Sequence, residues 1–178
     1  KLNMYVSRIP DIAWDLIDVA DKPLTIIYPK AKNLAANLLA DDQSVGIRIT
    51  NETFSKTLCE RFRKPIVSTS ANISGQPSPS NFNEISEEIK AGVDYVVNFR
   101  QDEKIKANPS GIIKLGEGGV VQVICCDRMR WESIRGILPS KGFCWIRMCC
   151  RGGCLSHLVG LPFFICRATI TSLSVNRG

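Results

Sequence analysis

The chain has 178 residues and a formal net charge of +6, from 23 Lys and Arg against 17 Asp and Glu. That length suits one domain with a sizeable core. A composition of 44% hydrophobic and 22% charged residues excludes an intrinsically disordered polymer. The sequence contains no run of the ~20 apolar residues that a membrane-spanning helix needs, so we expect no membrane partner.

Charge and cysteine are distributed unevenly along the chain. Residues 1–124 hold 15 basic and 15 acidic side chains, whereas residues 125–178 hold 8 basic and 2 acidic ones, so the tail supplies the whole +6. The tail also holds seven of the eight cysteines, and Cys59 is the exception. We therefore predict two regions, 1–124 and 125–178. The neutral first region lacks the basic footprint of a nucleic-acid binder, and its single cysteine is typical of the reducing cytoplasm.

Helices and short strands alternate through the first region. The first helix is predicted over residues 10–21, because Ile9, Ala13, Leu16, Ile17 and Ala20 recur with helical spacing. β-prone runs then predict strands at 24–28 and 45–49. A second helix follows at 53–63, with Asn51 as its cap and Phe54, Leu58 and Phe62 as its apolar stripe.

Further elements complete this alternation. We predict a strand at 65–69, a helix at 82–90 capped by Ser80 or Asn81 and ended by Gly92, and a strand at 94–99. The last two strands, 111–115 and 120–124, flank the sequence Gly-Glu-Gly-Gly and form a predicted hairpin. The order predicts an α/β fold with a mixed parallel and antiparallel sheet and flanking helices.

The tail, residues 125–178, shows neither helical nor strand periodicity. Three interpretations stay open: out-of-frame sequence, a small cysteine-rich domain, or a disordered tail. Its candidate metal ligands are Cys144, Cys149, Cys150, Cys154, His157 and Cys166. Their spacing fits no common zinc site, so we expect no protein-bound metal. We also expect weak order and ready proteolysis beyond about residue 126, because glycines and prolines interrupt the tail repeatedly.

A polar loop follows the predicted strand at 65–69. Strand alternation would place Ser68, Ser70 and Asn72 on one face at the carboxyl end of that strand. Ligands bind beyond the carboxyl ends of strands in open α/β sheets, and hydroxyl and amide groups there can donate to phosphate or carboxylate oxygens. The alternative is an ordinary polar turn, in which Ser and Asn side chains bond to nearby backbone.

The loop carries a resemblance to a known family. Its sequence Ser-Ala-Asn-Ile-Ser-Gly, residues 70–75, closely resembles the Ser-Ala-Asn-x-Ser-Gly signature of the YrdC-like threonylcarbamoyl-AMP synthases, which act in tRNA modification. Residues 45–49, 109–113 and 121–124 resemble three further family elements in the right order, with Gly111 in place of the usual Thr. The resemblance covers about residues 9–124 and implies a YrdC-like twisted sheet that is incomplete at its N-terminus.

The resemblance implies an enzyme, a nucleotidyltransferase that joins L-threonine, bicarbonate and ATP into threonylcarbamoyl-AMP and releases pyrophosphate. Catalysis would depend on positioning and charge neutralisation, with no acid–base residue assigned. The implied threonine-binding residues are Arg48, Ser68 and Ser110. The implied ATP-binding residues are Ser44, Ser70, Asn72 and Ser78. ATP would enter with Mg²⁺, and tRNA or tRNA-modifying proteins are possible partners.

Two departures from the family pattern indicate an impaired fragment. The chain begins at Lys1, and no Lys-x-Arg element that would grip phosphates occurs in residues 1–30. Cys125 stands where the family has a nucleotide-contacting arginine. Losing such a donor typically slows an enzyme by about a hundredfold to a thousandfold. The alternative function is a non-catalytic module that binds tRNA or double-stranded RNA.

Overall fold

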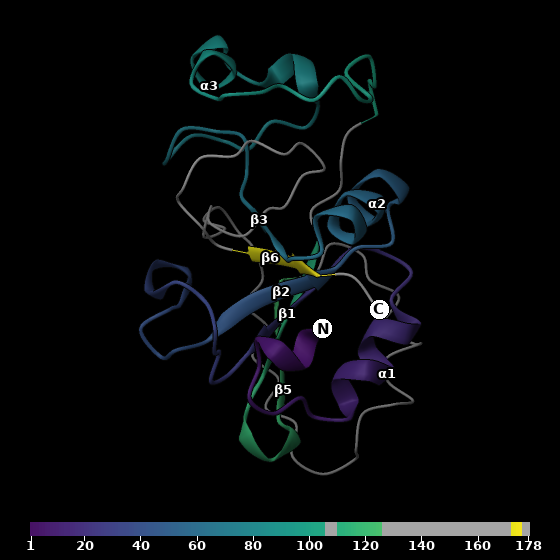
Figure 1. The fold of residues 1–178 in the computed structure, drawn as a ribbon, viewed down its shortest axis with the longest axis vertical. Coiled ribbons are helices and arrows are strands. Elements are labelled where there is room, and N and C mark those ends of the chain that lie inside the picture. Colours follow the sequence, from purple (N-terminus) through teal and green to yellow (C-terminus); the bar gives the residue numbers. More distant parts are fainter. Residues whose placement is uncertain (106–109, 126–171, 176–178) are drawn as a thin grey trace.

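A six-stranded mixed sheet forms the centre of the computed structural model, which describes residues 1–105, 110–125 and 172–175 (Figure 1). The strands are β1 (Leu24–Tyr28), β2 (Val45–Ile49), β3 (Ile66–Ser68), β4 (Gly111–Leu115), β5 (Val121–Cys125) and β6 (Ser172–Val175), in the sheet order β3-β6-β2-β1-β4-β5. β1 pairs with β4 in parallel and with β2 antiparallel, which confirms the predicted mixed α/β sheet.

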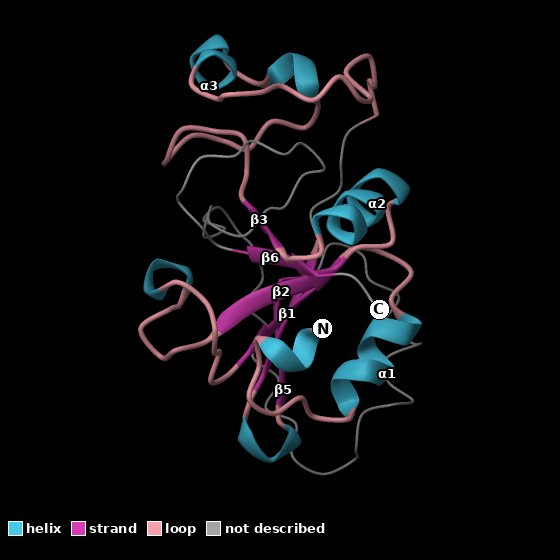
Figure 2. Cartoon of the chain, in the orientation of Figure 1, coloured by secondary structure: helices cyan, strands magenta, loops and turns pink. Residues whose placement is uncertain are grey.

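Within the described residues, three α-helices and four 3₁₀ turns accompany the sheet. The helices are α1 (Ile12–Val19), α2 (Thr53–Phe62) and α3 (Glu87–Ala91), and the 3₁₀ turns are η1 (Leu2–Met4), η2 (Ala36–Leu38), η3 (Phe82–Glu84) and η4 (Glu117–Gly119). η3 and α3 lie at the top of the view, away from the sheet (Figure 1). The chain between β3 and η3 has no regular structure (Figure 2).

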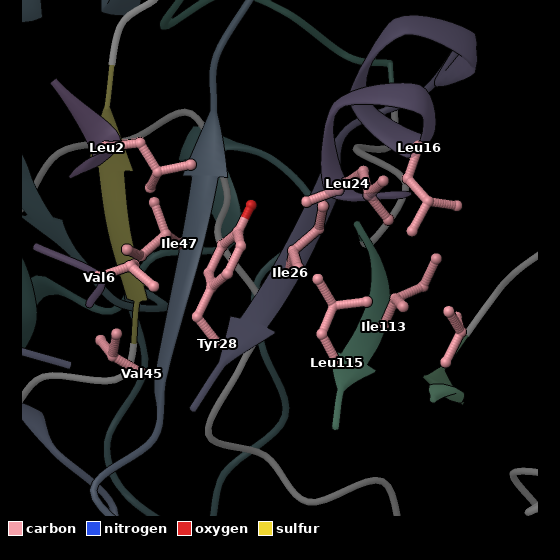
Figure 3. Packing of buried hydrophobic residues seen from close by; sticks show 12 residues of the cluster. Leu2, Val6, Leu16, Leu24, Ile26, Tyr28, Val45, Ile47, Ile113 and Leu115 are labelled. Atoms are coloured by element: carbon pink, nitrogen blue, oxygen red, sulfur yellow. The ribbon is translucent and has the colours of Figure 1, made fainter. Parts of the chain in front are cut away.

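The hydrophobic core lies between one face of the sheet and the N-terminal segment. α1 contributes Ala13 and Leu16 to it, as the helical spacing predicts. Figure 3 shows Tyr28 of β1 beside Ile47 of β2, with Leu16 on the far side of the cluster. Burial of such side chains typically contributes about 1.5–3 kcal/mol each, so this cluster is the main source of the domain's stability.

Strands β1, β2 and β4 have the predicted bounds, and the hairpin between β4 and β5 is confirmed. The strand predicted at 94–99 is wrong, because that segment is irregular and exposes Tyr95 and Phe99. The helix predicted at 82–90 is divided at Ile85 into η3 and α3, and Ile85 is buried. Asn81 caps η3 as predicted, and Gly92 ends α3.

The predicted details of α2 need two corrections. Glu52 is its cap rather than Asn51, since its carboxylate accepts hydrogen bonds from the backbone N–H groups of Phe54 and Ser55. Phe62 is 57% exposed, and the residues of α2 that are buried are Ser55 and Cys59. The predicted apolar stripe is therefore wrong at its last residue, because α2 buries a face with small side chains.

The tail supplies one strand that the sequence did not predict. β6 pairs in parallel with β2 and antiparallel with β3, so the two strands of the first region are separated by a strand of the second. The candidate tail ligands, from Cys144 to Cys166, lie outside the described residues. The predicted weak order of the tail stays a prediction.

Candidate functional site

A pocket of about 370 Å³ opens between α1, the strands β1 and β2, and the first turn of α2. Its lining is largely apolar, with Arg48 and Glu52 among its charged residues. The lining residues are Ile17, Ala20, Asp21, Lys22, Pro23, Leu24, Ile26, Tyr28, Ile47, Arg48, Ile49, Thr50, Asn51, Glu52 and Ser55. The volume and the few polar groups in an apolar wall are typical of small-molecule sites.

Arg48 is the predicted site residue that lines this pocket. Burial lowers the pKa of the half-buried guanidinium, while the neighbouring Cys59 and Glu52 raise it, and arginine stays cationic at physiological pH in such a setting. Burial likewise raises the pKa of the Cys59 thiol against the opposing effect of Arg48. The site thus presents a partly desolvated cation, which can bind a carboxylate through two parallel hydrogen bonds.

Thr25 and Ser110 lie beside Arg48 across the sheet. Thr25 of β1 is the register partner of Arg48 in β2, and its hydroxyl lies 3.2 Å from the Ser110 hydroxyl at the start of β4. Both hydroxyl-bearing residues are buried. Two predicted threonine-side residues, Arg48 and Ser110, are therefore brought into one row through Thr25. The sequence analysis missed Thr25, although a polar residue inside the strand Leu-Thr-Ile-Ile-Tyr was a signal for it.

Ser44 lies at the other end of β2 from Arg48. The two residues are four positions apart, which corresponds to about 13 Å along a strand. The Ser44 hydroxyl donates a hydrogen bond to Asp42, and Lys114 of β4 donates to the same carboxylate at 2.6 Å. Hydrogen bonds from Lys114 and Ser44 lower the pKa of Asp42 to about 2. Ser44 therefore belongs to a charged cluster at the start of β2.

The loop after β3 contains Ser70, Asn72 and Ser78. The Asn72 amide donates to the carbonyls of Ile73 at 3.0 Å and Gln76 at 2.8 Å. The Ser78 hydroxyl donates to the Asn72 side-chain oxygen at 3.3 Å. The loop is thus braced by its own side chains, which is the bonding that the polar-turn alternative expects of an asparagine.

The predicted common face of Ser68, Ser70 and Asn72 is not observed. β3 ends at Ser68, so strand alternation does not extend into the loop. Ser68 itself is buried in the strand, whereas Ser70 and Asn72 are half-buried beyond it. Because β3 ends at Ser68, Ser68 belongs to the sheet, whereas Ser70 and Asn72 belong to the loop that follows it.

The strand registers divide the predicted residues between two edges of the sheet. Arg48 is level with Ile66, the first residue of β3, through their shared partner Ser174. The chain of β3 then runs toward the edge at which β2 begins, so the loop leaves the sheet at the edge of Ser44. Arg48 and Ser110 lie at the opposite edge. Ser44 and the point at which the loop leaves β3 therefore lie toward one edge, and two of the three predicted threonine-side residues lie toward the other.

The described residues contain no group of three or more His, Cys, Asp or Glu side chains that could hold a metal ion. In the same part of the chain, no helix has the length and apolar character to cross a membrane. Pro109 of the predicted Pro-Ser-Gly element lies outside the described residues.

Comparison with known proteins places these features in a family. The family model Sua5/YciO/YrdC, described as "Telomere recombination", matches residues 1–124. No solved structure gives a significant match.

Individual relatives match over part of their length. A threonylcarbamoyl-AMP synthase of Pseudoalteromonas translucida is 34% identical over 101 residues, which cover 55% of this chain and 54% of the relative. A Methanocaldococcus jannaschii protein that is provisionally named threonylcarbamoyl-AMP synthase is 35% identical over 118 residues, or 66% of this chain and 54% of the relative. A threonylcarbamoyl-AMP synthase of Klebsiella pneumoniae is 40% identical over 80 residues, or 43% of this chain and 42% of the relative. The chain thus spans about half the length of the curated relatives it matches.

Proposed function

The chain belongs to the Sua5/YciO/YrdC family, and from that premise we propose that it is part of a threonylcarbamoyl-AMP synthase. This enzyme would be a cytoplasmic nucleotidyltransferase that uses L-threonine, bicarbonate and ATP and serves tRNA modification. The observation that carries the proposal is the braced loop of residues 70–78 after β3, because it bears the Ser-Ala-Asn-Ile-Ser-Gly sequence within the region that the family model matches.

The proposed reaction has a balanced chemistry. The amine of threonine and bicarbonate form a carbamate with loss of water, and one oxygen of the carbamate attacks the α-phosphorus of ATP. The new bond is the carbamate–phosphate bond, the bond to the β-phosphate oxygen breaks, and pyrophosphate leaves. Such a step needs aligned reactants and neutralised charge more than acid–base groups.

On the threonine side, we propose that Arg48 binds the carboxylate of the amino acid. A half-buried guanidinium suits that role, since its planar donors match a carboxylate and little water competes. Ser110 and Ser68 are proposed to line the same side. The row from Arg48 through Thr25 to Ser110 supports this assignment for Ser110.

On the nucleotide side, we propose that Ser44, Ser70, Asn72 and Ser78 form the ATP site, to which Asn72 and Ser78 contribute by shaping the loop that carries Ser70. Mg²⁺ would enter on the phosphates of ATP, and we assign no protein ligand to it because the described residues offer no carboxylate cluster. We propose slow turnover by these residues, because Cys125 stands where the family has a nucleotide-contacting arginine. tRNA and tRNA-modifying proteins are proposed as partners of the pathway rather than of this site.

The RNA-binding alternative is not favoured. The relatives are named as synthases, and residues 1–124 carry equal numbers of acidic and basic side chains. Tight RNA binding depends on neutralising several phosphates with Lys and Arg.

The test is a binding and turnover measurement on the purified chain. We expect ATP and L-threonine to bind in calorimetric titrations, and pyrophosphate release to require both threonine and bicarbonate at a rate well below that of a full-length relative. Binding of neither substrate would overturn the proposal. Phosphate release that is independent of threonine would also contradict it.

A further inference from the structure

We infer a division of roles inside the loop of residues 70–78: Asn72 and Ser78 hold the loop in shape, while Ser70 and Ser74 present hydroxyl groups to an anionic ligand. Ser74 is thereby added to the candidate site. The identification of that ligand as the phosphates of ATP rests on the proposed function, whereas the shape of the loop is independent of it.

The tip of the loop is a hydrogen-bonded β-turn. The Gln76 N–H donates to the Ile73 carbonyl at 2.9 Å, and Gly75 has a φ of +84°. A positive φ at the third residue alone is the pattern of a type II turn, which requires glycine at that position. Ser74 is the second residue and therefore stands at the apex of the turn.

Asn72 bridges the two ends of this turn. Its amide nitrogen has two hydrogens, and it donates to the carbonyls of Ile73 and Gln76 at the first and last positions. Its oxygen accepts from the Ser78 hydroxyl. An amide engaged in this way has no donor left for a phosphate, and its remaining lone pair would repel one. Asn72 is therefore a positioning residue, and Ser78 in turn orients it.

Ser70 and Ser74 differ from Asn72 and Ser78 in this respect. Ser74 is exposed and Ser70 is half-buried. Within the described ranges, neither hydroxyl has a hydrogen-bond partner. A hydroxyl on a rigid turn can donate to an anionic oxygen without first breaking a bond inside the protein.

The test combines hydrogen exchange of the unliganded chain with titrations of ATP, adenosine and inorganic pyrophosphate. Asn72→Ala and Ser78→Ala should accelerate exchange of the Gln76 amide without any ligand, by tenfold or more for Asn72→Ala, and Ser78→Thr should restore protection. Asn83→Ala is the matched control, because Asn83 is an exposed asparagine nearby whose side chain has no bond among the described residues. If Asn72 contacted the ligand instead of holding the loop, its replacement would leave this exchange unchanged. Unchanged exchange would therefore overturn the positioning role of Asn72.

Ser74→Ala tests the hydroxyl role. We expect it to weaken binding of ATP and pyrophosphate about tenfold, as loss of a hydrogen bond to a charged group does. Adenosine binding and the exchange of the unliganded loop should be unchanged. If the wild-type chain binds ATP and Ser74→Ala binds it equally well, the inference about Ser74 is wrong while the proposed function stands. If the wild-type chain binds neither ATP nor pyrophosphate, the proposed nucleotide site fails together with the hydroxyl role. The exchange data still decide whether Asn72 and Ser78 hold the loop in shape.

Discussion

Arg48 is the residue on which the proposed threonine site depends. Replacing it with alanine should weaken threonine binding by about tenfold to a hundredfold, because a hydrogen-bonded charge contributes about 1.5–3 kcal/mol. Arg48→Lys should recover only part of the loss, since an ammonium keeps the charge but lacks the planar fork. Calorimetric titration with L-threonine measures both effects, and ATP binding should stay unchanged.

Arg61→Ala is the matched control for Arg48, because Arg61 is an exposed arginine in the last turn of α2. It should leave threonine affinity unchanged. Equal threonine affinity of Arg48→Ala and the wild-type chain would show that this guanidinium serves the fold and not a ligand.

Asp42 makes a pH-dependent contribution to stability. Its pKa is lowered to about 2 by the hydrogen bonds from Lys114 and Ser44, against about 3.9 in an unfolded chain. A depressed carboxyl pKa stabilises the folded state above the unfolded value, and the contribution is lost as pH falls from about 4 through about 2. The Asp42 side chain is 51% exposed, so the effect should stay below about 1 kcal/mol.

The measurement is urea unfolding of the wild-type chain and Asp42→Asn at pH 7 and near pH 2. The wild-type chain should be the more stable at pH 7, and the difference should disappear at the lower pH. Asp41→Asn, at the neighbouring exposed aspartate, should leave the free energy of unfolding at pH 7 unchanged. A difference of the same size at both pH values would exclude the carboxylate as its source.

The cap of α2 gives a prediction at the level of the element. Burial acts to raise the pKa of Glu52, but hydrogen bonds from Ser55 and the Phe54 N–H outweigh it and lower the pKa. Glu52→Ala should destabilise the protein by about 1–2 kcal/mol, because it leaves helix N–H groups unpaired. Glu52→Ser should recover most of that loss, and Lys56→Ala, one turn into the helix, should have little effect. Equal urea midpoints for Glu52→Ala and Lys56→Ala would contradict the cap.

The sequence predicts correctly those elements whose own apolar pattern is enough to indicate that they are buried. β1 and β2 are short apolar runs, and β1 is bounded by Pro23 and Pro29. The first and last residues of these strands can therefore be predicted from the sequence. The segment 94–99 has the same β-prone composition but no neighbouring strand among the described residues, and Tyr95 is 73% exposed. Strand propensity depends on such neighbours, and a single sequence does not reveal them.

The candidate site was predictable to a similar extent. The family signature locates the loop at residues 70–75, but it does not tell which groups are engaged inside the loop. The bonds of Asn72 reach only four residues along the chain, yet they depend on where β3 ends. Because the strand stops at Ser68, the alternation extrapolated to Ser70 and Asn72 failed.

At the scale of the whole molecule, the position of β6 connects the two regions that charge and cysteine content separate. β3 pairs with no other described strand, so its attachment to the sheet depends on residues 172–175. Such pairing spans more than a hundred residues of sequence, and a four-residue strand carries too little local signal to be predicted. The tail is therefore part of the sheet at one point, even though its composition differs from that of the first region.

Deleting residues 172–178 tests this connection. β2 and β3 should lose the hydrogen-bond partner between them, so their amides should exchange faster and the thermal midpoint should fall. Deleting residues 176–178 alone is the matched control, since it leaves β6 intact, and it should change neither measurement. Unchanged protection of the β3 amides in the longer deletion would mean that β3 does not depend on the tail. In that case residues 1–124 would hold their own sheet, and protease should remove the chain beyond about residue 126 without loss of the folded core.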